Sequence, residues 1–148
     1  MRTIAYLACF AGLTFAAGQV SALEYRSVGA HPAICYDLPQ ATSKKLAIAS
    51  RGMPLEIVID NADWVKVRDS AGKMSWVESK ALDKRRTLMV TVPTADVHLS
   101  ADVASSVLFK VAQNVLLELK QNTETGWLEV RHPDGISGYI RSNEVWGE

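Results

Sequence analysis

An internal repeat constrains this chain more than any other feature. The segment Trp-Val-Lys-Val-Arg at residues 64–68 returns as Trp-Leu-Glu-Val-Arg at residues 127–131, and similar residues flank both segments. The alignment needs one extra residue in the polar stretch 121–126, where a loop would tolerate it. Self-similarity at one spacing indicates repeated structural units. We therefore expect two copies of one small domain, at residues 23–86 and 87–148.

Each copy has the pattern of short β-strands. Apolar and polar residues alternate with period two in residues 64–68 and 127–131, as in strands with one buried face. The segments 69–72 and 132–135 end in Asp-X-X-Gly and Pro-Asp-Gly, which favour turns between strands. Five short strands in about 60 residues are typical of a small closed or half-closed barrel.

One segment allows a helical alternative. Residues 103–119 are rich in Val, Leu and Ala, which a helix would accommodate. The matching segment of the first copy, residues 42–59, contains Gly52 and Pro54, which disfavour one long helix. We therefore expect an all-β chain of two tandem small barrels.

The first 22 residues have the organisation of a signal peptide. Arg2 is the only charge among them, and residues 4–17 form an apolar run. Val-Ser-Ala at residues 20–22 supplies the small residues of a cleavage site, so the mature chain is expected to start at Leu23. The apolar run is shorter than the roughly 20 residues that span a bilayer. We expect a periplasmic or secreted protein with no transmembrane segment after cleavage.

Charge and composition restrict the class of partner. The chain has 16 Lys and Arg against 16 Asp and Glu, a formal net charge of zero. A nucleic-acid-binding protein needs a basic surface to neutralise phosphates, so this class is not expected. The Asp-Lys-Arg-Arg run at residues 83–86, between the copies, is interpreted as a short solvated linker that restrains the two barrels.

Cys35 is the only cysteine left in the expected mature chain, so no internal disulfide can form. It matches Val97 of the second copy, an inward strand position, which favours a buried structural residue over a nucleophile. The three histidines have unrelated spacings and no cysteine pair, so no metal site is expected. Gly-rich phosphate loops and nucleophile elbows are missing from the sequence, so we expect neither a cofactor nor enzymatic activity.

Several short motifs resemble those of a known family. The second copy contains Gly-Trp-Leu-Glu-Val-Arg at residues 126–131, Asp134-Gly135 and Gly-Tyr-Ile at residues 138–140. The first copy contains Asp-Trp-Val-Lys-Val-Arg at residues 63–68. The chain thus resembles a tandem pair of bacterial Src-homology-three-like (SH3-like) domains. In exported proteins this resemblance implies binding to cell-wall peptides or to protein partners, although the fold alone is poorly specific for ligand.

The closing strand departs from the eukaryotic members that it resembles. Gly-Tyr-Ile-Arg-Ser-Asn-Glu-Val at residues 138–145 is similar to Gly-Tyr-Ile-Pro-Ser-Asn-Tyr-Val. Arg141 replaces the proline and Glu144 replaces the tyrosine, and both replaced residues line the groove that binds polyproline helices. Recognition of proline-rich peptides is therefore not expected.

Side-chain alternation places aromatic rings on the polar side of the predicted strands. In the first copy Val65 and Val67 share one side, which must face the core. Trp64 therefore lies on the other side, together with Arg68, and the second copy repeats this pattern. Aromatic rings beside arginines suit amphipathic contacts and capture of carboxylates. The predicted ligand-binding residues are Trp64, Trp76, Trp127, Tyr139, Arg68, Arg131 and Arg141.

Two functional interpretations of these aromatic residues stay open. The first is an exported, non-enzymatic binding module that recognises peptidoglycan peptide or an envelope protein. The second is a structural or adaptor scaffold whose aromatic residues pack the two barrels together. Trp146 lies beyond the last matched strand and is expected to fasten the C-terminal end.

Overall fold

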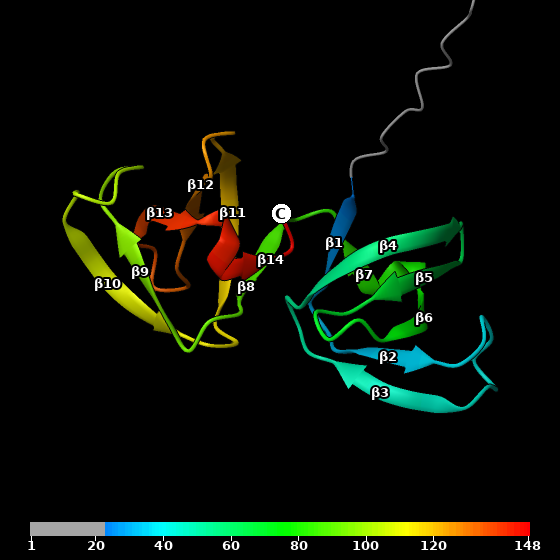
Figure 1. The fold of residues 1–148 in the computed structure, drawn as a ribbon. Helices are drawn as coiled ribbons and strands as arrows, with labels where there is room; N and C mark the ends of the chain where they lie inside the picture. Colours follow the sequence, from blue (N-terminus) through cyan, green and yellow to red (C-terminus); the bar gives the residue numbers. More distant parts are fainter. Residues whose placement is uncertain (1–22) are drawn as a thin grey trace, which may run out of the picture.

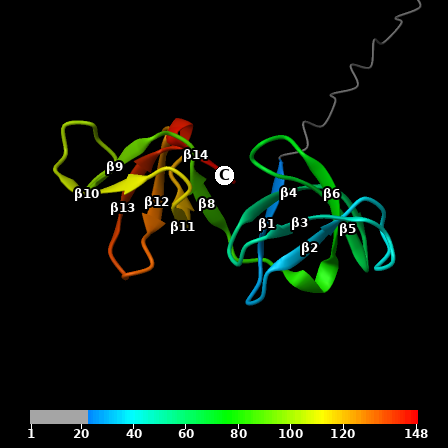
Figure 2. The ribbon, with the colours of Figure 1, turned by 90° about the horizontal axis from the view of Figure 1, so that it is seen from below.

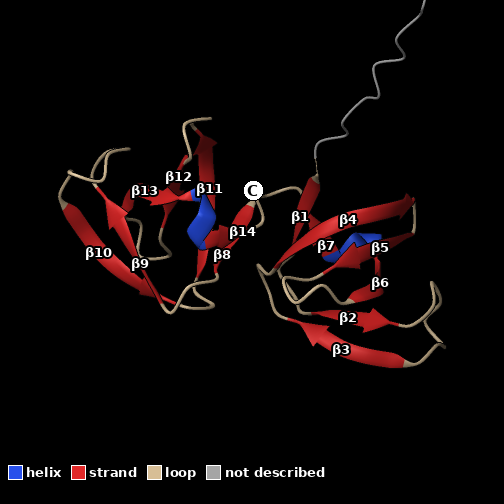
Figure 3. Ribbon diagram, in the orientation of Figure 1, coloured by secondary structure: helices blue, strands red, loops and turns tan. Residues whose placement is uncertain are grey.

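The computed structural model describes residues 23–148, which form β-strands and two short 3-10 segments, with no α-helix in this part of the chain (Figure 3). Across these 126 positions, no helix has the length and apolar character to cross a membrane. The predicted signal peptide at residues 1–22 lies outside the described residues.

The first barrel is a seven-stranded antiparallel sheet in the order β3-β2-β6-β5-β4-β1-β7 (Figure 1). Hairpins join β2 to β3, β4 to β5 and β5 to β6, and β1 and β7 lie at one end of the sheet. Its elements are β1 (Glu24–Val28), β2 (Ala33–Tyr36), β3 (Lys45–Ala49), β4 (Pro54–Asn61), β5 (Trp64–Arg68), β6 (Met74–Glu78), the 3-10 segment η1 (Ser79–Ala81) and β7 (Leu82–Asp83).

The second barrel repeats this order of strands as β10-β9-β13-β12-β11-β8-β14. The all-β tandem fold is therefore confirmed, and the segment that allowed a helical alternative forms β10 and β11. The elements are β8 (Thr87–Val90), β9 (Thr94–His98), β10 (Val107–Ala112), β11 (Leu116–Asn122), β12 (Trp127–Arg131), β13 (Ser137–Arg141), the 3-10 segment η2 (Ser142–Glu144) and β14 (Val145–Trp146).

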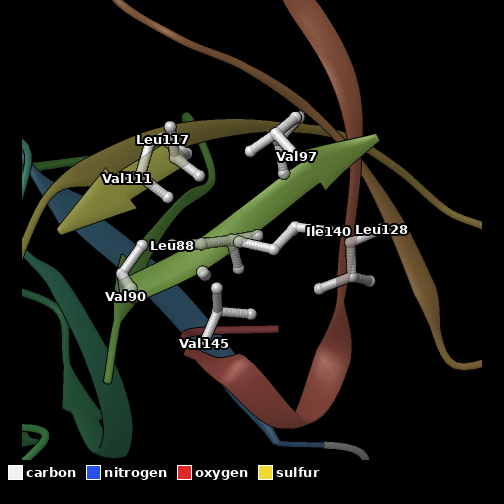
Figure 4. Packing of buried hydrophobic residues seen from close by; sticks show 10 residues of the cluster. Leu88, Val90, Val97, Val111, Leu117, Leu128, Ile140 and Val145 are labelled. Carbon is white, nitrogen blue, oxygen red and sulfur yellow. The ribbon is translucent and has the colours of Figure 1, made fainter. Parts of the chain in front are cut away.

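Each barrel encloses its own apolar core, built from the inward side of its strands. Val65 and Val67 are 0% and 1% exposed, and Leu128 and Val130 are both fully buried, as the alternation predicts. Figure 4 shows the second core, where Leu and Val side chains from several strands meet around Ile140. Cys35 is a buried free thiol in the first core, and Val97 takes the matching place in the second.

The hairpin turns depend on glycine. Gly72 and Gly135, in the turns after β5 and β12, have φ angles of 81° and 96°, a region that only glycine enters without strain. In the first turn, Asp69 Oδ1 also accepts hydrogen bonds from the backbone N–H groups of Ala71 and Lys73. Both tight turns set the register that carries the aromatic residues described below.

Hydrogen bonds join the barrels at a junction where β8 lies beside the first barrel (Figures 1 and 2). The Thr87 hydroxyl donates to the carbonyl oxygen of Gly52 at 2.6 Å, and Ser27 Oγ lies 2.6 Å from Thr87 Oγ1. A Cβ added to Gly147 would lie 2.9 Å from Pro54 Cβ, so the two barrels approach closely here as well. The junction is therefore packed and hydrogen-bonded.

An aromatic pair completes the junction. Trp146 meets Tyr25 edge-on, with ring centroids 5.1 Å apart and planes at 86°. Trp146 thus fastens its own strand to β8 and also contacts the first barrel. Burial raises the pKa of Tyr25 above its ordinary value, and the neighbouring Glu56 carboxylate raises it further.

The linker interpretation is correct for Lys84 and Arg85 and wrong for Asp83 and Arg86. Asp83 belongs to β7 and pairs with Ser27 of β1. Lys84 and Arg85 are exposed. Arg86 is partly buried: its guanidinium carbon lies 5.5 Å from the centre of the Tyr25 ring, and Nη2 donates to the Gly147 carbonyl at 2.8 Å. The reason is that Tyr25 offers an aromatic face to which a cation is attracted. Arg86 is therefore part of the junction.

Candidate functional site

The first barrel carries an aromatic surface on strands β2, β5 and β6. Trp64 is partly exposed and meets Tyr36 edge-on, with ring centroids 5.3 Å apart and planes at 83°. Trp76 lies directly opposite Tyr36 across the β2–β6 pair. We call Tyr36, Trp64, Trp76 and Glu78 the first aromatic surface.

Charged residues stand opposite both tryptophans of this surface. Glu78 is the cross-strand neighbour of Trp64, and Lys66 that of Trp76. Lys66 Nζ lies 6.0 Å from the centre of the Trp76 ring, within the range of a cation–π contact. Glu78 Oε2 also pairs with Lys80 Nζ at 2.7 Å, and Lys80 is 83% exposed, so the solvent screens this pair.

Two hollows flank the Trp64–Tyr36 pair and share Glu78 and Lys80 as lining residues. One, of about 450 Å³, is also lined by His31 and Tyr36. The other, of about 470 Å³, is also lined by Trp64 itself. Both volumes lie in the range of small-ligand sites, so a peptide-sized group could reach Trp64 from one hollow and Tyr36 from the other.

The second barrel carries the matching surface on strands β9, β12 and β13. Trp127 is partly exposed and meets His98 edge-on, at 5.3 Å and 82°. The Arg141 guanidinium carbon lies 5.3 Å from the centre of the Trp127 ring. Tyr139 lies opposite His98 across the β9–β13 pair. We call His98, Trp127, Tyr139 and Arg141 the second aromatic surface.

The charges of the two surfaces are reversed at matching positions. Glu78 faces Trp64 in the first barrel, where Arg141 faces Trp127 in the second. Lys66 faces Trp76 in the first barrel, where Glu129 faces Tyr139 in the second. The framework is thus the same, while the ionic groups beside each ring have the opposite sign.

Two predicted site residues lie apart from the aromatic surfaces. Arg68 is at the far end of β5 from Trp64, and its Nη2 pairs with Glu56 Oε1 at 2.7 Å. Arg131 is at the far end of β12 from Trp127 and lines a cleft beside the first barrel. The structure therefore brings Trp64 together with Trp76 in the first barrel, and Trp127 together with Tyr139 and Arg141 in the second. Arg68 and Arg131 lie outside both groups.

Sequence reasoning missed two aromatic residues of these surfaces. Tyr36 and His98 are buried beside the leading tryptophans, although both follow an inward core residue, Cys35 or Val97. A local bulge between Cys35 and its neighbour shifts the register against β3, which simple alternation does not foresee. Their matching positions in the two copies were the signal that could have identified them.

The described residues give little basis for metal binding. Between residues 23 and 148, no group of three or more His, Cys, Asp and Glu side chains is arranged to hold a metal ion. His98 Nδ1 lies 3.0 Å from the Ser105 carbonyl oxygen, a contact that orients its ring against Trp127. The chemistry offered by both surfaces is aromatic contact together with single charged groups.

One known protein family matches both barrels. The family model described as the bacterial SH3 domain matches residues 30–84 and again residues 94–147. No curated protein sequence matches the chain.

Three solved structures of longer proteins are similar to this chain, which spans about half the length of each. Those of NlpC2 and NlpC1 from Trichomonas vaginalis are each 11% identical, with a TM-score of 0.40; the matches cover 86% and 95% of this chain and 49% and 51% of theirs. An NlpC/P60 family protein from Bacillus cereus ATCC 10987 is 18% identical over 83% of this chain and 56% of its own, with a TM-score of 0.39.

Proposed function

This chain belongs to the bacterial SH3 domain family, and we propose that it is a non-enzymatic module that binds peptidoglycan peptide. Membership of this family suggests a binding module associated with the cell wall. The observation that carries the finer proposal is the duplicated aromatic surface. In each barrel a partly exposed tryptophan lies edge-on against a second ring and opposite a charged residue.

Reversed charge suits a zwitterionic peptide. Glu78 beside Trp64 offers a carboxylate to an ammonium group, and Arg141 beside Trp127 offers a guanidinium to a carboxylate. Stem peptides of a cell wall carry both kinds of group. We infer that the first surface takes the cationic part of such a peptide, and the second takes the anionic part.

The junction supports binding over the scaffold alternative for these residues. An adaptor whose surface aromatics cement the barrels would place them between the two sheets. The aromatic contact at the junction instead joins Tyr25 with Trp146. Trp64 and Trp127 contact rings of their own barrels and keep part of their surface exposed.

The proposed setting is the periplasm or the outside of the cell. The N-terminal segment supports export, because residues 1–22 combine one positive charge, an apolar run and small residues before Leu23. N-terminal sequencing of the protein recovered from its native envelope fraction would test this. A mature chain that starts at Leu23 is the expected result, and one that keeps residues 1–22 would contradict export by cleavage.

Co-sedimentation of the purified protein with peptidoglycan tests the binding function. The protein should sediment with the polymer, and Trp64→Ala combined with Trp127→Ala should reduce retention at least fivefold, because each change removes an aromatic contact. Ile48→Ala combined with Leu99→Ala is a matched control, since both residues are exposed and lie one in each barrel. Lack of retention of the native protein, or equal retention of the folded tryptophan variant, would overturn the proposal.

A further inference from the structure

A cleft of about 500 Å³ lies between the two barrels, away from both aromatic surfaces. Three arginines from separate segments line it. Arg51 comes from the turn between β3 and β4, Arg85 from the segment between β7 and β8, and Arg131 from the end of β12. The first barrel, the linker and the second barrel therefore each contribute one guanidinium group.

The lining of the cleft is positively charged. Its one acidic residue is Glu118, so three arginines against one carboxylate give a formal charge of +2 with His132 neutral. The Glu118 carboxylate lies 3.4 Å from Lys120 Nζ, which offsets part of its charge. Arg85 Nη2 forms an ion pair of 3.5 Å with Asp83 Oδ2, which likewise offsets part of its charge. Within residues 23–148, neither Arg51 nor Arg131 forms an ion pair.

The repeat shows what is unusual about Arg131. Its match in the first barrel, Arg68, is neutralised by Glu56, whose side chain is 8% exposed. Glu118 is the match of Glu56 and stands opposite Arg131 across β11 and β12. It pairs with Lys120 instead, at a position where the first barrel has Val58. In the second barrel Glu118 therefore pairs with Lys120 and not with Arg131, which leaves the Arg131 guanidinium on the cleft unpaired within the described part of the chain.

The junction fixes the first-barrel side of the cleft. Gly52, next to Arg51, accepts the hydrogen bond from the Thr87 hydroxyl at 2.6 Å. A Cβ at Gly52 would lie 3.5 Å from Leu116 Cδ1, so the turn that carries Arg51 rests on the second barrel. The three arginines are therefore held on one cleft by the docking of the barrels.

We propose that this cleft binds a phosphate group, as a soluble phosphate ester or as the headgroup of an anionic lipid. A phosphate monoester carries nearly two negative charges at neutral pH and several strong acceptor oxygens. Arginine presents a planar fork of donors that matches such oxygens in pairs. Three guanidinium groups from separate segments match a doubly charged phosphate better than they match a singly charged carboxylate. The site does not depend on the peptidoglycan proposal.

Calorimetric titration of the purified protein with inorganic pyrophosphate tests the site. We expect saturable binding that weakens as salt is raised, since part of the attraction is screened. Arg51→Ala and Arg131→Ala should each weaken binding about fivefold to tenfold, because each removes a charge-assisted contact. Lys44→Ala is the matched control: it removes one exposed positive charge far from the cleft and should bind as the native protein does.

Vesicle co-sedimentation separates the two sources of phosphate. Stronger retention on phosphatidylcholine vesicles that contain phosphatidic acid, whose headgroup is a phosphate monoester, than on phosphatidylcholine alone, lost in Arg51→Ala and Arg131→Ala, assigns the site to a lipid headgroup. Pyrophosphate binding without vesicle retention assigns it to a soluble phosphate ester. Each variant is checked by circular dichroism, and Arg51→Gln and Arg131→Gln replace any that fails to fold.

Three results would overturn the proposal. The first is the absence of saturable binding of pyrophosphate by the native protein. The second is an equal loss in Lys44→Ala, which would indicate attraction by overall charge. The third is a loss in Arg131→Ala alone, which would place the site on the second barrel without the first.

Discussion

In the first barrel Trp64 lies edge-on against Tyr36 and faces Glu78 across the hairpin; in the second, Trp127 lies edge-on against His98 and faces Arg141. The ring geometry is nearly identical, with centroids 5.3 Å apart in both. The ionic group beside the ring has changed sign. The inward residues of both copies are apolar and form the two cores, so these changes of charge lie on the outer side of the strands.

The same comparison extends to the pair of glutamates on β4 and β11. Glu56 is nearly buried and neutralises Arg68, whereas Glu118 is 37% exposed and pairs with Lys120. One substitution along the strand, Val58 in the first copy and Lys120 in the second, supplies the competing cation. Equivalent residues therefore have different roles because a neighbour differs.

The largest expected difference between the barrels concerns Gly138 and its match Ser75. A Cβ at Gly138 would lie 2.7 Å from both the His98 carbonyl oxygen and Val97 Cγ1. Gly138→Ala should therefore lower the free energy of unfolding by about 2 kcal/mol through overpacking. Ser75 already carries a side chain, so Ser75→Ala should change stability by no more than about 0.5 kcal/mol. Urea unfolding followed by circular dichroism measures both, and equal midpoints for the two variants would refute the difference.

The ion pairs provide the next contrast. Glu56→Gln weakens a charge-assisted hydrogen bond of 2.7 Å to Arg68, whose side chain is 44% exposed, so the cost should be about 1 kcal/mol after solvent screening. Glu118→Gln should cost at most about 0.3 kcal/mol, because its pair is longer and exposed on both sides. Urea unfolding in parallel tests the order. A larger loss in Glu118→Gln would show that the diverted carboxylate is still structurally important.

Exchange of the surface charges sharpens the comparison of the aromatic surfaces. Phenylalanine amide, a cation, should perturb the NMR signals of the first surface, and N-acetylphenylalanine, an anion, those of the second. Glu78→Arg and Arg141→Glu should each lower the affinity of the altered surface for its preferred probe about threefold to fivefold, as expected for an exposed charged contact. Each change should also raise the affinity of that surface for the other probe. Lys80 partly neutralises Glu78, so the change in the first barrel should be the smaller one. Unchanged preferences in both variants would exclude charge as the discriminating feature.

The smallest expected difference is a response to alkaline pH. Burial raises the pKa of Tyr25, and the matching residue of the second barrel, Thr87, does not titrate there. The folded state holds the Tyr25 proton more tightly than the unfolded state does, so this contribution to stability is complete below the ordinary pKa of about 10. It is lost as pH rises through the higher folded value. Unfolding curves against pH should show a decline that Tyr25→Phe removes, and an unaltered decline in that variant would exclude Tyr25 as its source.

The sequence was sufficient to predict the fold and the cores for a local reason. Alternation along a strand decides which side chains point inward, and duplicated segments such as Trp64–Arg68 and Trp127–Arg131 tested that assignment twice. The half-exposed tryptophans followed from the same rule. The prediction was limited where position along the strand mattered, because Arg68 shares a side with Trp64 and still lies four residues away from it.

The junction could not be predicted, because it depends on contacts between residues far apart in the chain. Tyr25 and Trp146 are 121 positions apart and occupy places where the opposite copy has Thr87 and Asp83. These mismatches were visible in the alignment, yet nothing local indicated that the two exceptions would meet. The linker residue Arg86 was misassigned for the same reason, since its partner Tyr25 lies 61 positions earlier in the chain.

Docking through Thr87, Gly52, Tyr25 and Trp146 also determines how two weak contacts can be combined. When one end of an extended partner is held on the first aromatic surface, its other end experiences a high effective concentration at the second. If the barrels were flexibly tethered, the effective concentration would be raised for partners of many lengths. Because the junction is packed, it is raised only for partners whose charged groups match one spacing. The two barrels together would then select partners by the distance between the partner's positive and negative groups, because only a matching distance allows both surfaces to bind at once.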